Sequence, residues 1–182
     1  MNMIKTKNIV NGAMCIALGV LLPQVFHLVG GAGPAFLPMH IPVLLAGFLV
    51  SPITGLYVGI LTPILSHLIT GMPPIAPIPM LPIMIFELST YGFIAGILYN
   101  KLKMNVFISL AGSMLAGRIT YGFIVYIMLT FFHVKMAGPI VAVIGAVNNG
   151  ILGIILQIVF IPVLVKLLEG ELIHVRSNIS PK

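Results

Sequence analysis

Two charged side chains, Glu87 and Arg118, lie inside long apolar segments of this chain, where charge is unusual. No Asp, Glu, Lys or Arg occurs between Lys7 and Glu87, and none between Lys135 and Lys166. A carboxylate can bind an amine, a ring N–H or a hydroxyl, whereas a guanidinium suits a carboxylate or a phosphate. A charge in hydrocarbon costs about 2.5–3.5 kcal/mol and usually faces an interior cavity. We therefore interpret both residues as candidates for a binding site.

Other polar side chains recur near the middle of the apolar segments or in the half that we assign below to the outer side of a membrane. Tyr91 lies one helical turn from Glu87, and Tyr121 lies three residues from Arg118, so each tyrosine shares a helical face with a charge. Polar groups at one depth on several helices predict a convergent site for a small ligand. The predicted substrate-binding residues are Glu87, Tyr91, Arg118, Tyr121, Asn148, Asn149, His67, His40, His27 and Gln24.

Each of these residues also has a purely structural interpretation. Glu87 and Arg118 can form an ion pair between their helices, which does not exclude ligand contact. His40 and His67 can lie at the outer interface or bond to a backbone carbonyl. The adjacent asparagines can join neighbouring helices, and only one of them need face a pocket. Tyrosines are often ordinary interior aromatics.

Patterns typical of catalysis, metal binding and nucleotide binding do not occur in the sequence. No two histidines have i, i+4 spacing, and HExxH, GxSxG and GxxxxGK[ST] do not occur. Glu87 is the one acid within the predicted spans, so no carboxylate pair is available. The single cysteine, Cys15, excludes an internal disulfide. We predict a protein without enzymatic activity, metal or cofactor.

The composition is typical of an integral membrane protein. Hydrophobic residues make up 59% of the 182 residues and charged residues 7%, against about 25% charged in soluble domains. The net charge of +6 does not indicate nucleic-acid binding, because the basic residues flank apolar segments instead of forming one patch. We predict an all-α membrane protein with a single domain over residues 1–182.

Six apolar segments predict six transmembrane helices with both termini in the cytoplasm. The segments are 8–29, 39–50, 53–70, 80–100, 105–132 and 139–168, and the second is short for a full span. Six crossings place seven basic residues on the terminal side and only Lys135 on the other, so the positive-inside rule makes the termini cytoplasmic. The seven are Lys5, Lys7, Lys101, Lys103, Lys166, Arg176 and Lys182.

Two outward loops rich in glycine and proline join the first segment to the second and the third to the fourth. They are the run 30–34 and the run 71–79, which contains four prolines. Proline stiffens an extended path and glycine permits unusual backbone angles. The loops either cap an outward-facing pocket in a compact bundle or simply connect the helices.

In the first segment, Ala13 and Ala17 lie four residues apart on one helical face. Small residues at this spacing let helix backbones approach closely, either within one chain or between chains. With this pair, the stretch LPMHIPVLLAGF at 37–48, then LTP at 61–63 and GMPP at 71–74, the chain resembles the substrate-binding (S) component of an energy-coupling factor (ECF) vitamin transporter. The resemblance covers essentially the whole chain.

The resemblance implies the function and the partners. It implies a subunit in the plasma membrane of a prokaryote that captures a vitamin or a precursor in an outward-facing pocket. The subunit would dock through Ala13 and Ala17 on a transmembrane coupling subunit driven by two cytoplasmic ATPases. Pantothenate, a pyridoxine-like or hydroxymethylpyrimidine-like ring, and a cobalamin-precursor base or nucleoside all fit the polar residues. The alternative is a small homo-oligomeric secondary transporter or channel, although the two halves show no obvious inverted repeat.

Overall fold

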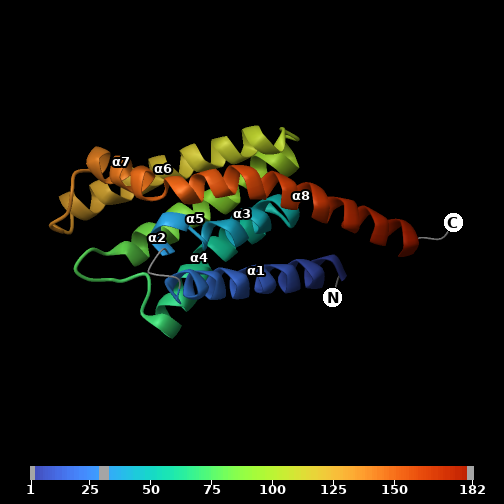
Figure 1. Cartoon of the computed structure of the whole chain (residues 1–182), viewed down its shortest axis with the longest axis horizontal. Helices are drawn as coiled ribbons and strands as arrows, with labels where there is room; N and C mark the ends of the chain where they lie inside the picture. The colour runs from blue at the N-terminus through green and yellow to red at the C-terminus, as the bar shows by residue number, and fades with distance from the viewer. Residues whose placement is uncertain (1–2, 29–32, 180–182) are drawn as a thin grey trace.

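A computed structural model describes residues 3–28 and 33–179, with side-chain burial described for 6–26 and 35–169. The described residues form helices and short connections, and no strand occurs among them. The elements are α1 (Met3–Leu28), α2 (Gly33–Phe36), α3 (His40–Leu49), α4 (Pro52–Thr70), α5 (Met80–Gly96), the π-helical turn η1 (Ile97–Lys101), α6 (Val106–Thr130), α7 (Pro139–Asn149) and α8 (Ile151–Ile179) (Figure 1).

Five helical stretches are long and apolar enough to cross a membrane, which confirms a multi-pass helical protein. They are Thr6–Phe26, Pro52–Thr70, Met80–Lys101, Val106–Thr130 and Ile151–Glu169. The first four match predicted segments to within a few residues. The predicted second segment is α3, whose ten residues span about 15 Å, half of the hydrocarbon core. The count of six full crossings therefore stays a prediction.

The sixth predicted segment is not one continuous helix as expected. It is divided into α7 and α8 at Gly150, whose N–H donates to the carbonyl of Ala146 and ends α7. Asn148, Asn149 and Gly150 are all poor helix formers, which explains why the helix breaks there. The break leaves α7 as a separate short helix in which no described residue is fully buried.

The helix ends are sorted between the two ends of the bundle. Figure 1 shows the start of α1 and the end of α8 at one end, and the connections 71–79 and 131–138 at the other. That both chain termini lie on one side of a membrane stays a prediction. The assignment of that side to the cytoplasm depends on the distribution of basic residues and stays a prediction.

Glycines bring the backbones of α3, α4 and α5 into direct contact. A Cβ on Gly47 of α3 or on Gly55 of α4 would meet the carbonyl oxygen of Gly92 on α5, and a Cβ on Gly92 would meet the carbonyl oxygen of Gly55. Such close approach is how small residues stabilise helix pairs in a membrane, where no hydrophobic force drives association. This three-helix unit fixes the position of α5, the helix that carries Glu87.

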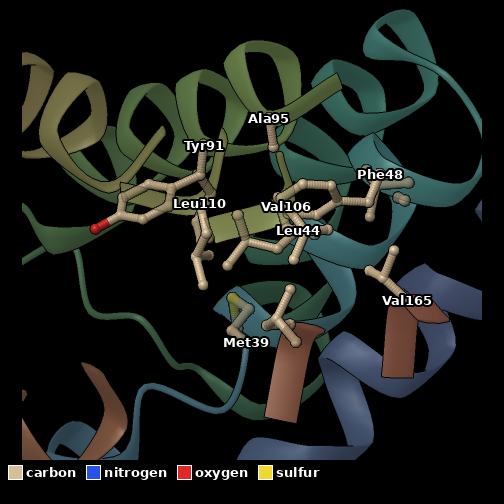
Figure 2. Close-up of a cluster of buried hydrophobic side chains, with 13 residues drawn as sticks. Met39, Leu44, Phe48, Tyr91, Ala95, Val106, Leu110 and Val165 are labelled. Atoms are coloured by element: carbon tan, nitrogen blue, oxygen red, sulfur yellow. The ribbon is translucent and has the colours of Figure 1, made fainter. Parts of the chain in front are cut away.

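A cluster of apolar side chains surrounds this unit on the side of α6 and α8. Val43, Leu44, Leu88, Ile161 and Val165 are among its fully buried members. Figure 2 shows the cluster, in which side chains from α3, α5, α6 and α8 meet. Cys15 of α1 packs against it, so the single cysteine of the sequence serves as a packing residue.

We expect Gly92→Ala to lower the free energy of unfolding by about 1–3 kcal/mol, because the new methyl group overpacks a backbone contact. The measurement is thermal unfolding of the purified chain in detergent. Gly145→Ala is the matched control, since a Cβ there has no neighbour within 4 Å. Alanine favours helix over glycine, so the control should melt at or above the wild-type temperature. Equal melting of Gly92→Ala and wild type would contradict the close packing of α4 and α5.

Candidate functional site

The ends of α4 place a proline-rich loop over one end of the bundle. Ser51 caps the start of α4, its Oγ accepting from the N–H of Thr54 at 3.0 Å. Gly71 ends the helix in the left-handed conformation with φ 74°, where glycine carries no Cβ penalty. His67 Nδ1 lies 2.8 Å from the carbonyl oxygen of Pro73, a hydrogen bond that fixes the loop against the last turn of α4.

A cavity of about 680 Å³ lies beneath this loop, at the end of the bundle opposite the start of α1 and the end of α8. It is within the size range of small-molecule sites in proteins. The loop residues Met72, Pro73 and Pro74 contribute to its wall, so the predicted outward loop 71–79 adjoins it. Leu37 and Pro38, just before α3, contribute as well, whereas residues 30–32 of the other predicted loop lie outside the described residues. The rest of the wall comes from Pro23, Met39, His40, Ser66, Ile78, Met80, Met84, Glu87, Arg118, Tyr121, Met136, Ala137, Val141, Ala142, Gly145, Ala146 and Asn149.

Glu87 and Arg118 form an ion pair at this cavity. Arg118 Nη1 donates to Glu87 Oε1 at 2.7 Å and joins α6 to α5. The Glu87 side chain is 3% exposed and that of Arg118 is 11% exposed, so the pair is shielded from solvent. Arg118 Nη2 is buried and has no hydrogen-bond partner among the described residues. The pair therefore links α5 to α6, and the guanidinium still has a donor to offer a ligand.

His40 lies beside this pair at the first residue of α3. Its Nε2 is 3.9 Å from Glu87 Oε1, too far for a hydrogen bond, and neither ring nitrogen bonds to another described residue. Tyr91 packs edge-on against the imidazole, with ring centroids 5.0 Å apart and an interplanar angle of 89°. Figure 2 shows the Tyr91 hydroxyl pointing away from the other labelled side chains. Tyr91 thus orients His40 without lining the cavity itself.

The structure brings half of the ten predicted site residues to the cavity. His40, Glu87, Arg118, Tyr121 and Asn149 line it, so Asn149 is the asparagine that faces the cavity. The other four described candidates do not line the cavity. Tyr91 packs against His40, and His67 bonds to the loop. Asn148 and Gln24 are the sequence neighbours of the lining residues Asn149 and Pro23. The side chain of His27 lies outside the described residues.

Sequence reasoning missed the apolar wall and one polar residue. Met80 and Met84 lie on the face of α5 that carries Glu87. Met84 follows Met80 by four positions and precedes Glu87 by three, and this helical spacing could have identified them. Ser66 of α4 also lines the cavity, and its buried Oγ has no partner among the described residues. A lone serine in an apolar helix gives no sequence signal of this kind.

Within the described part of the chain, no cluster of three or more histidine, cysteine or acidic residues is placed to hold a metal ion. The prediction of no metal and no cofactor stays a prediction.

The predicted docking residues lie on an open face of α1. Ala13 and Ala17 are both exposed, whereas Gly12 and Gly19 are buried and face α4. A Cβ at Gly12 would meet Thr54, and one at Gly19 would meet Thr62, so the glycines make the close contact within the chain. The alanine pair is therefore not used for internal packing and is available to another helix.

Comparisons with known proteins agree with this architecture. The family model for the substrate-specific component of ECF transporters matches residues 7–165, which include every cavity residue. No curated protein and no solved structure matches the chain. Because the match spans most of the chain and the described residues form a helical membrane bundle, this protein belongs to the family of substrate-specific components of ECF transporters.

Proposed function

We propose that this chain captures a small vitamin or vitamin precursor at the cavity next to Glu87 and Arg118 and delivers it to an ATP-driven ECF importer. Family membership supports the role of a substrate-capture subunit of an ECF importer, and in this proposal the chain is a transport component without enzymatic activity. The observation that carries the proposal is the cavity itself, which combines apolar walls with a few convergent polar groups.

The size of the cavity is compatible with small ligand molecules. A pantothenate-sized molecule, a pyridoxine-like or hydroxymethylpyrimidine-like ring, or a cobalamin-precursor base or nucleoside is compatible with a cavity of about 680 Å³. Arg118 Nη2 would donate to an acceptor on the ligand, and Tyr121 and Asn149 would contact its ring or its polar substituents.

The proposed partners follow from the family and from the open face of α1. A transmembrane coupling subunit would pack a helix against Ala13 and Ala17, and two cytoplasmic ATPases would supply the energy. The chain lies in the plasma membrane of a prokaryote in this proposal, with the cavity facing outward and the lysines at the termini facing the cytoplasm.

We expect the isolated chain to bind its ligand and to lack concentrative uptake, because the sequence has no nucleotide-binding motif to couple ATP to transport. The test compares uptake into liposomes that contain the chain alone with uptake into liposomes that contain the complete importer and ATP. Accumulation should require the complete importer. Robust accumulation by the chain alone would favour the alternative, a small homo-oligomeric secondary transporter.

A further inference from the structure

The charges at the cavity balance each other. Among the described lining residues, the charged side chains are Glu87 and Arg118, and they are paired at 2.7 Å. A ligand carboxylate or phosphate that replaced Glu87 as the partner of Arg118 would leave Glu87 buried and unpaired. A charged ligand that left the pair intact would itself remain unbalanced in a site of low polarity. Both arrangements are strongly unfavourable in a buried site.

Three unpartnered polar groups at the same cavity nevertheless require hydrogen bonds. His40 is 2% exposed and has two ring nitrogens without partners, and Ser66 is 1% exposed and offers a hydroxyl. Arg118 Nη2 offers a donor. These groups come from α3, α4 and α6 and have no partners among the described residues, which points to a ligand with several neutral polar atoms.

The remaining wall favours an apolar ring. Five methionines line the cavity, and a thioether adapts its shape and makes favourable contacts with aromatic rings. Prolines from two loops add rigid apolar surface. The methionines are Met39, Met72, Met80, Met84 and Met136.

We infer that the cavity selects an uncharged ligand, a ring-sized and mostly apolar molecule whose neutral acceptor meets Arg118 Nη2 and whose further neutral polar groups meet His40 and Ser66. The Glu87–Arg118 pair then acts as a charge filter that rejects carboxylates and phosphates of the same shape. This inference rests on the proposed capture function and narrows its ligands to neutral rings, bases and nucleosides, which makes pantothenate itself a poor ligand.

The test uses the purified full-length chain in lipid nanodiscs and three matched pairs of probes. The pairs are pantothenol with pantothenate, pyridoxine with pyridoxine 5′-phosphate, and the dimethylbenzimidazole ribonucleoside with its 5′-phosphate. The six probes are added as an equimolar mixture in yeast extract, and retained molecules are identified by mass spectrometry after denaturation. We expect an uncharged molecule to be retained. For a retained probe, we expect the charged partner to bind at least roughly tenfold more weakly.

The outcomes separate this inference from the capture function. Retention of a carboxylate or a phosphate would overturn the charge filter while the capture function stands. If nothing is retained from the mixture or the extract, the capture function fails and the inference fails with it.

A variant tests the filter directly. Glu87→Gln leaves the Arg118 cation without its anionic neighbour, so the preference for the uncharged member of a pair should fall at least roughly tenfold. The double variant Glu87→Gln/Arg118→Gln removes both charges and should restore the preference for the uncharged member, although with weaker binding. An unchanged preference in Glu87→Gln would show that the ion pair does not set the charge of the ligand.

Discussion

Replacing Ala13 or Ala17 with leucine should abolish most ATP-driven uptake by the assembled importer and leave ligand binding by the purified chain near wild type. Both alanines are exposed on α1, where a partner backbone can approach only if the side chains stay small. Overpacking such a contact costs about 1–3 kcal/mol, which weakens association by roughly 5- to 150-fold. Binding should survive because Pro23, the α1 residue at the cavity, lies six positions, about 9 Å of helix, after Ala17.

The measurements are uptake by the reconstituted complex, co-purification with the coupling subunit, and ligand titration of the chain alone. Ala111→Leu on α6 makes the same change at another exposed alanine and should leave all three unchanged. Normal transport by both α1 variants would refute docking through these alanines. Unfolding of both variants would instead mean that the alanines pack within the chain.

The long spans were predictable because their signals are local. The predicted segments 53–70 and 105–132 match α4 and α6 to within two residues at each end, because long apolar runs stand out from the turns that bound them. The break at Gly150 was missed because hydropathy remains high on both sides of the asparagine pair. The contact of Gly55 with Gly92 was also missed, because it depends on which helices become neighbours.

The polar part of the site was predictable because charge inside a membrane is costly and rare. That cost identified Glu87 and Arg118, and their shared depth correctly suggested neighbouring helices. Depth alone does not give direction around a helix axis, which is why Asn148 and His67 were included although neither lines the cavity. Apolar side chains carry no free-energy cost inside a membrane, so nothing in the sequence distinguishes the methionines of the cavity wall from the many other apolar residues.

Arg118→Gln and Glu87→Gln should each lower the affinity for the ligand by roughly tenfold or more, which is about 1.4 kcal/mol. Arg118 Nη2 is a buried donor at the cavity without a partner among the described residues, and Glu87 holds that guanidinium in place through the bond at 2.7 Å. Glutamine keeps hydrogen-bonding capacity and most of the packing volume, so the loss should report the missing charge. Lys101→Gln removes a positive charge from an exposed residue distant from the cavity and should leave the affinity unchanged.

Ligand titration and a thermal melt without ligand, carried out on the same samples, distinguish a binding role from a purely structural one. Removing one partner strands the other, so some loss of melting temperature is expected in both single variants. If the pair is only structural, the melting temperature falls while the affinity stays at the wild-type value, and both residues leave the site. The double variant completes the cycle. Two independent ligand contacts lose affinity additively, whereas Glu87 acting through Arg118 makes the second substitution cost little once the first is present.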